Sequence, residues 1–137
     1  MIFIPTASRQ LLLKLAQNNS AAENWLLKLY TNNVTPGLFD TAASYTEAAG
    51  GGYVAKTLLG ASWAYSLDGS NKGLSTYANQ TWTFTGPLTG SATLYGMFVV
   101  RVTTGDLLMA ERFSSSFQPL NNGDFFTYGP QVTATNE

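Results

Sequence analysis

The chain has 137 residues, of which seven are Lys or Arg, eight are Asp or Glu and none is His or Cys, and its formal net charge is −1. This length makes one domain with an adequate core, while the missing residue types exclude thiol chemistry, disulfides and His-ligated metals. The few scattered basic residues argue against nucleic-acid binding, and charged residues at 11%, against roughly 25% in ordinary domains, give little repulsion between copies.

The first residues form an arm (residues 1–6) in front of a single domain (residues 7–137). The arm is apolar and too short to make a core, so we expect it to add a strand to the sheet edge of a neighbouring molecule. Its five candidate interface residues are Met1, Ile2, Phe3, Ile4 and Pro5. Helical spacing of apolar residues then predicts one helix over Ala7–Gln17, with Thr6 as its N-cap.

The segment Trp25–Tyr30 fits two secondary structures. Ser20 and Glu23 match a capping box that would start a second helix through this segment. The same six residues also alternate, with Trp25, Leu27 and Leu29 on one side. We predict a strand, because turn-rich sequence follows at once.

From Thr31 onward, turn residues recur about every ten positions, which is typical of antiparallel β structure. The stretch Tyr95–Val100 is apolar at both alternating sets of positions, which predicts a central strand covered on both faces. The fold class is therefore mainly β, an antiparallel β-sandwich, jelly-roll-like, with one N-terminal helix. The strands predicted after Thr31 are Tyr53–Leu59, Ser62–Leu67, Thr81–Thr85, Thr93–Val102, Leu107–Phe113 and Phe125–Ala134.

A few acidic residues invite a catalytic interpretation. Two carboxylates can cleave a glycoside, and Asp106, Glu111 and Glu47 are the candidates. Glu111 is followed by Arg112 late in an apolar strand, and a structural ion pair, with Arg101 or Glu47 as a further partner, is the favoured interpretation.

The segment Asp68–Gly73 resembles a calcium-binding loop, but Lys72 stands where an oxygen ligand is required, so we predict a turn. We expect no catalytic residue, metal or cofactor. No apolar window approaches the roughly 18 residues of a membrane span, so we expect no membrane partner.

Aromatic residues could stack on sugar rings if they lay exposed, but alternation favours core packing. Trp63 and Tyr65 share one side of a predicted strand, and Trp82 and Phe84 share one side of another, as the core of a β-sandwich requires. Trp25 and Tyr77 fit this core pattern least, and we count them with the arm as candidate interface residues.

Short motifs along the chain resemble those of one group of proteins. They are Leu29–Pro36 (LYTNNVTP), Tyr45–Glu47 with Gly52 and Tyr53, Trp63, Thr83–Gly86, Leu94–Gly96 and Leu107–Phe113 with its closing AERF. Together they resemble a group of small structural proteins of tailed-phage virions, over roughly Leu11 to Phe113.

The resemblance implies a capsid decoration (cement) protein on the outer surface of the virion, bound to the major capsid protein. Such a protein bridges neighbouring subunits by contact area and needs no catalytic side chain. We also expect self-association, with a trimer as one arrangement. The alternative is a carbohydrate-binding module of a tail fibre or adhesin, which would use exposed Trp or Tyr rings.

Overall fold

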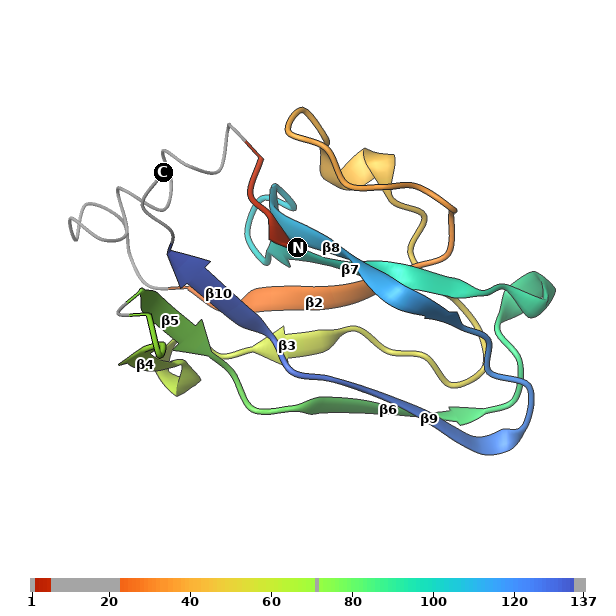
Figure 1. Cartoon of the computed structure of the whole chain (residues 1–137). Helices are drawn as coiled ribbons and strands as arrows, with labels where there is room; N and C mark the ends of the chain where they lie inside the picture. Colours follow the sequence, from red (N-terminus) through yellow and green to blue (C-terminus); the bar gives the residue numbers. More distant parts are fainter. Residues whose placement is uncertain (1, 6–22, 71, 135–137) are drawn as a thin grey trace.

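The computed structural model describes residues 2–5, 23–70 and 72–134 (Figure 1). This part of the chain is mainly β with antiparallel sheets, and it contains no α-helix of seven or more residues. Its only helical segments are the short 3₁₀ turns η1 (Ala42–Ser44), η2 (Gly60–Ser62) and η3 (Thr89–Ser91). The predicted helix over Ala7–Gln17 lies outside the described residues.

The larger sheet has five strands in the order β1-β8-β7-β2-β3. The predicted strand Trp25–Tyr30 is confirmed as β2, and the helical alternative is wrong for these six residues. Its alternation has a physical cause, because Leu27 and Leu29 are fully buried in the core. The other members are β1 (Ile2–Phe3), β3 (Lys56–Leu58), β7 (Leu94–Arg101) and β8 (Leu107–Phe117).

Strand β7 lies in the middle of this sheet and is covered on both faces, as its two-sided apolar sequence predicts. Met97 and Val99 belong to the main core cluster, whereas Phe98 and Val100 belong to a second cluster. In this second cluster the Tyr45 ring stacks on Phe98 at 5.3 Å between ring centroids. The segment after β2 thus covers the outer face of the sheet.

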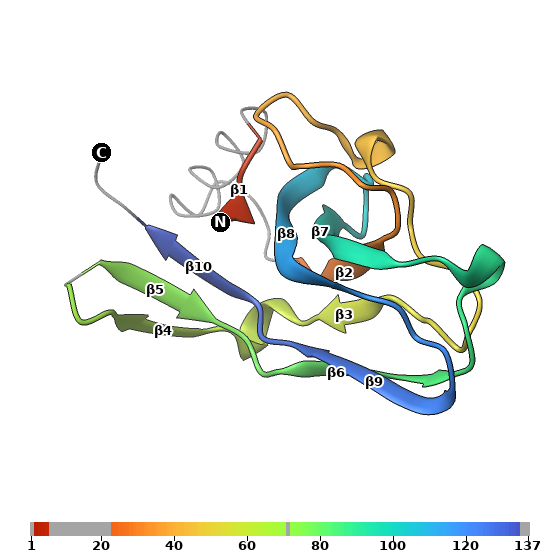
Figure 2. The ribbon, with the colours of Figure 1, turned by 45° about the vertical axis from the view of Figure 1, so that its right-hand side comes forward.

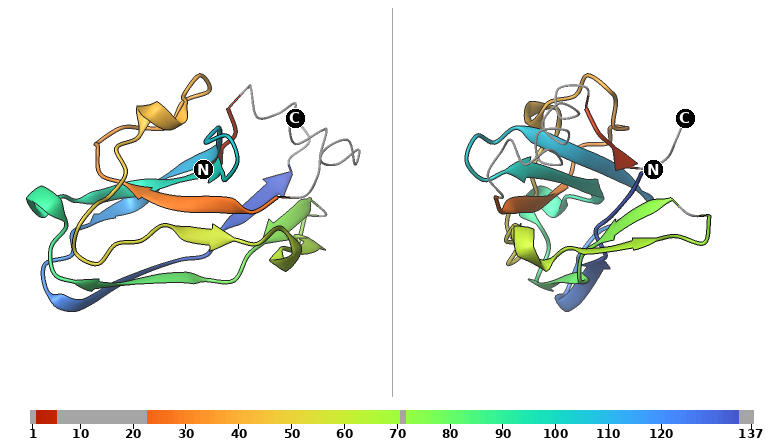
Figure 3. Two further views of the ribbon diagram at one scale, coloured as in Figure 1. Left: turned by 180° about the vertical axis from the view of Figure 1, so that it is seen from behind. Right: turned by 90° about the vertical axis from the view of Figure 1, so that its left-hand side faces the viewer.

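The second layer is a long ribbon in two parts (Figures 2 and 3). Strand β6 (Gln80–Thr85) pairs with β9 (Asn122–Tyr128), and β10 (Gln131–Ala134), β5 (Gly73–Thr76) and β4 (Ala64–Leu67) form a three-stranded sheet in that order. The N–H of Tyr77 donates to the Pro130 carbonyl where the parts join.

Several predicted boundaries need correction. The single strand predicted over Phe125–Ala134 is two strands, because Gly129 and Pro130 interrupt it and proline has no N–H to donate. The strand predicted over Tyr53–Leu59 is shortened to β3, and β5 was not predicted.

The main core lies between the five-stranded sheet and β6. Trp82 and Phe84 point into it and are almost fully buried, which confirms the core position predicted for both. Trp82 also donates its Nε1–H to the Val54 carbonyl at 2.8 Å, which ties the segment before β3 to β6. The fold therefore buries the rings of β6.

Candidate functional site

The N-terminal arm lies on this chain's own sheet. Ile2 pairs with Glu111 and Phe3 pairs with Ala110, so β1 is an edge strand beside β8. We predicted that the arm would extend the sheet of a neighbour, and the structure instead gives its backbone hydrogen bonds to β8. Burial explains this placement, because Ile2 and Ile4 pack against the main core cluster and Pro5 is buried. Met1 lies outside the described residues.

The candidate interface residues Trp25 and Tyr77 pack against the main core cluster. Trp63 lies between them, with centroid distances of 5.6 Å to Trp25 and 5.2 Å to Tyr77. The Tyr77 hydroxyl oxygen accepts the Leu59 N–H at 2.9 Å. All three rings are half-buried, so the structure brings Trp25 and Tyr77 together as parts of one aromatic cluster.

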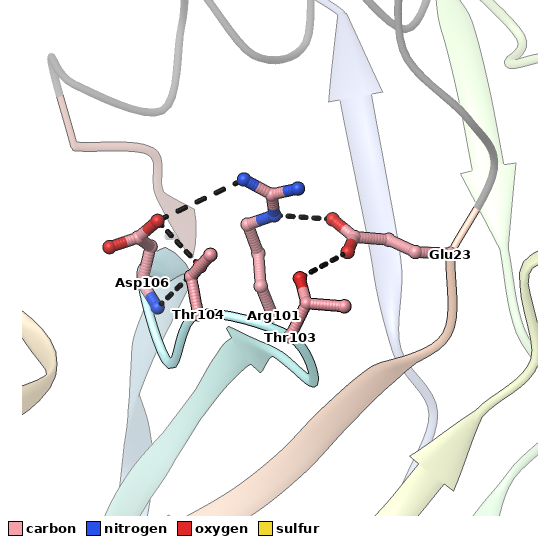
Figure 4. A network of polar contacts seen from close by, with 5 residues as sticks. All are labelled: Glu23, Arg101, Thr103, Thr104 and Asp106. Carbon is pink, nitrogen blue, oxygen red and sulfur yellow. Dashed lines mark hydrogen bonds and ion pairs between the residues drawn. The ribbon is translucent and has the colours of Figure 1, made fainter.

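A polar network joins the segment before β2 to the turn between β7 and β8 (Figure 4). Arg101 Nε donates to Glu23, and Thr103 Oγ1 donates to the other Glu23 oxygen at 3.0 Å. Asp106 lies 3.9 Å from Arg101 Nη1 and accepts the Thr104 hydroxyl at 2.6 Å. The hydrogen bond to Glu23 raises the pKa of Arg101. The network fits a structural role, because each charged group in it is held by a neighbour.

The remaining two candidate acids bind other partners. Glu47 accepts from Lys28 at 2.8 Å and from the Tyr53 hydroxyl at 3.3 Å. Glu111 accepts from the Tyr128 hydroxyl at 2.6 Å, and burial together with this carboxylate raises the pKa of Tyr128.

These contacts correct the predicted ion pairs. Arg101 and Glu47, the suggested further partners of the Glu111–Arg112 pair, bind Glu23 and Lys28 respectively. Arg112 donates to the Val34 carbonyl at 2.8 Å and to the side chain of Asn33, in the loop after β2. Sequence reasoning missed both partners, because they lie 78 and 79 positions away from Arg112.

The calcium-like segment is a turn, as predicted. Asp68 Oδ1 accepts the backbone N–H of Ser70 at 2.8 Å and of Lys72 at 2.9 Å. These two bonds lower the pKa of Asp68. Within residues 2–5, 23–70 and 72–134, no three His, Cys, Asp or Glu residues gather in a way that could hold a metal, and no helix is long and apolar enough to cross a membrane.

Large apolar side chains are exposed on separate segments. Phe39 is 90% exposed on the loop after β2, Tyr65 is 78% exposed on β4 and Phe125 is 65% exposed on β9. Tyr65 was predicted to lie in the core with Trp63, and this is wrong, because β4 is an edge strand whose four residues are all exposed. Leu67, on the same side of β4, is 67% exposed.

Hydrogen bonds of the neighbouring residue Asp40 fix the conformation of the loop that carries Phe39. The Asp40 carboxylate accepts the Gly37 N–H at 2.8 Å and the Tyr45 hydroxyl at 2.6 Å. Tyr45 is itself buried in the second core cluster. An exposed ring on a preorganised loop can bind an apolar pocket at a low cost in entropy.

Comparison of the sequence with protein-family models and with curated proteins gives no match.

Proposed function

We propose that the chain is a non-enzymatic structural protein of a phage particle, a capsid decoration protein that binds the major capsid protein on the outer surface of the virion. In this proposal the domain is a jelly-roll-like β-sandwich behind a leading helix, and it works by contact with its neighbours.

One observation carries the proposal beyond the sequence resemblance. Large apolar side chains, those of Phe39, Tyr65 and Phe125, are exposed on three segments of the surface. A protein that bridges several subunits needs contact surfaces in more than one direction, and aromatic side chains are frequent anchors of such contacts.

The charged side chains support the same function. Glu23, Glu47 and Asp106 each lie in ion pairs within the chain. Charges held in this way position loops and contribute little to long-range attraction of a charged ligand. Apolar contact with a protein surface is the interaction that this arrangement favours.

The test is reconstitution with capsids that lack this protein. We expect binding at a fixed stoichiometry and greater resistance of the capsids to heat and low salt. Phe39→Ser, Tyr65→Ser and Phe125→Ser should be compared with Ser116→Ala on β8, which is exposed and polar. At least one of the three aromatic variants should bind the capsid tenfold or more weakly than the Ser116 control.

Absence of capsid binding, with capsid stability unchanged, would refute the proposal. The same protein should then be tested on a glycan array, because the carbohydrate-binding alternative also uses exposed rings. Glycan binding that Tyr65→Ser abolishes would establish that alternative.

A further inference from the structure

Among the residues that the structure describes, strand β4 pairs on one side only, with β5, so its other edge is free. It is one of the two outer strands in the order β10-β5-β4, and all four of its residues are exposed. The hairpin of β4 and β5 projects from the body of the molecule (Figure 3, right). Its sequence, Ala64–Leu67, contains no charge and no proline. Charged residues and proline are two of the features that keep an edge strand from pairing with another chain, so an edge that lacks both is better suited to binding another strand.

The ladder between β4 and β5 shows which backbone groups face outward. The Asp68 N–H donates to the Lys72 carbonyl at 2.9 Å, so residue 68 directs its backbone groups toward β5. Hydrogen-bonded positions alternate along an antiparallel strand, so Ser66 also faces β5. Tyr65 and Leu67 therefore direct their N–H and C=O groups toward the free edge.

These outward groups are self-complementary. If a second copy lies antiparallel with a two-fold axis at Ser66, Tyr65 of each copy lies opposite Leu67 of the other. Each opposed pair then exchanges two backbone hydrogen bonds, which makes four across the axis. The same register sets the Tyr65 ring against a Leu67 side chain twice, which is a favourable cross-strand pair. A shift by one residue would place Tyr65 opposite Ser66 and lose this match.

We propose that the free edge of β4 binds β4 of a second copy of this chain, giving one continuous sheet in the order β10-β5-β4-β4-β5-β10. Electrostatics do not oppose this contact. Asp68 falls opposite Ala64 of the other copy, and a net charge of −1 gives little repulsion between copies. The contact is two-fold, unlike the trimer named above as one arrangement of self-association, and it does not depend on a role in the capsid.

The exposed area of β4 limits the size of the dimer interface. Tyr65 is 78% and Leu67 is 67% exposed, and an aromatic side chain removes roughly 150–250 Å² from water on burial. Two such pairs and four residues of backbone fall below the standard interface of about 1,600 Å². We therefore expect a weak dimer that forms only at high protein concentration.

A single cysteine tests the register directly. The chain contains no Cys, so Ser66→Cys introduces one thiol without background. In the proposed register Ser66 lies opposite its own copy in a non-hydrogen-bonded pair, where the Cα atoms are about 4.5 Å apart, within the range of a disulfide. We expect this variant to form a disulfide-linked dimer under mild oxidation at least tenfold faster than Ser116→Cys, an exposed serine on β8.

A second variant measures the contact without any covalent bond. Tyr65→Lys places a positive charge on the edge in each copy, and we expect it to be monomeric by sedimentation at concentrations where the unmodified chain dimerises. Phe125→Lys, which makes the same change on β9, should dimerise like the unmodified chain. Two results would overturn the proposal. One is an equal cross-linking rate for Ser66→Cys and Ser116→Cys, and the other is sedimentation of the unmodified chain as a monomer at every protein concentration tested.

Discussion

Replacing Gly96 by alanine tests the packing of the central strand. Gly96 lies in β7 opposite Tyr30 of β2 and Arg112 of β8. A Cβ atom added there would lie far inside contact distance of the Glu111 carbonyl oxygen and of the Tyr30 ring. The carbonyl belongs to β8 and the ring is fully buried, so neither can move without disturbing the sheet.

The size of the effect follows from this geometry. Overpacking a core costs typically about 1–3 kcal/mol, and a clash with backbone belongs at the upper end, so we expect Gly96→Ala to lower the free energy of unfolding by about 3 kcal/mol. The entropy of unfolding, about 2.1 cal/mol/K per residue, amounts to about 0.29 kcal/mol/K for 137 residues. The midpoint of thermal unfolding should therefore fall by about 10 °C.

Urea unfolding followed by circular dichroism measures this loss, and Gly69→Ala is the matched control. Apart from Gly69 and its two chain neighbours, no residue has a heavy atom within 4 Å of a Cβ added at Gly69, and the backbone φ angle of Gly69 is not in the left-handed region. The control should stay within about 0.5 kcal/mol of the unmodified chain. A loss below about 1 kcal/mol for Gly96→Ala would mean that Tyr30 and β8 are less tightly packed than the structure shows.

Three further changes probe charged and titratable groups. Backbone N–H bonds lower the pKa of Asp68 and Asp124 below the ordinary 3.8. Each carboxylate therefore adds stability that is complete above that pH and is lost below it. Between pH 5 and pH 2, Asp68→Asn should lose less free energy of unfolding than the unmodified chain. Burial raises the pKa of Tyr30 from 10.0 to about 12. The contribution of Tyr30 to stability is therefore complete below pH 10 and is lost toward pH 12. Tyr30→Phe should remove this loss of stability between pH 10 and pH 12 from the alkaline unfolding curve. Glu23→Gln should cost about 1 kcal/mol because it removes the negative charge that pairs with Arg101, and a difference that 1 M salt left unchanged would argue against an electrostatic origin.

Strands whose own side chains pack into the core were predictable from the pattern of their residues. Leu27 and Leu29 alternate with the partly exposed Leu26 and Lys28, and β7 is apolar on both sides because two clusters of side chains cover it. The break at Pro130 had a readable signal in the Gly-Pro pair, since proline cannot continue a ladder.

Other features had no local signal. Tyr65 alternates like a core residue, but alternation reports the period of a strand and not whether another layer covers it. Here the hairpin of β4 and β5 extends beyond the five-stranded sheet, and β4 remains exposed (Figure 2). The bond between Arg101 and Glu23 joins residues 78 positions apart, so only the fold brings them together.

The exposed edge and the exposed rings have different consequences for association. Backbone bonds at the β4 edge fix the direction and register of a second strand, whereas an apolar side chain such as Phe39 fits any pocket of suitable size. Specificity should therefore be greater at β4 than at the loop that carries Phe39. If both surfaces act, self-association through β4 leaves the Phe39 loops free to contact a different protein, since the loop after β2 and strand β4 lie far apart in the molecule (Figures 1 and 3).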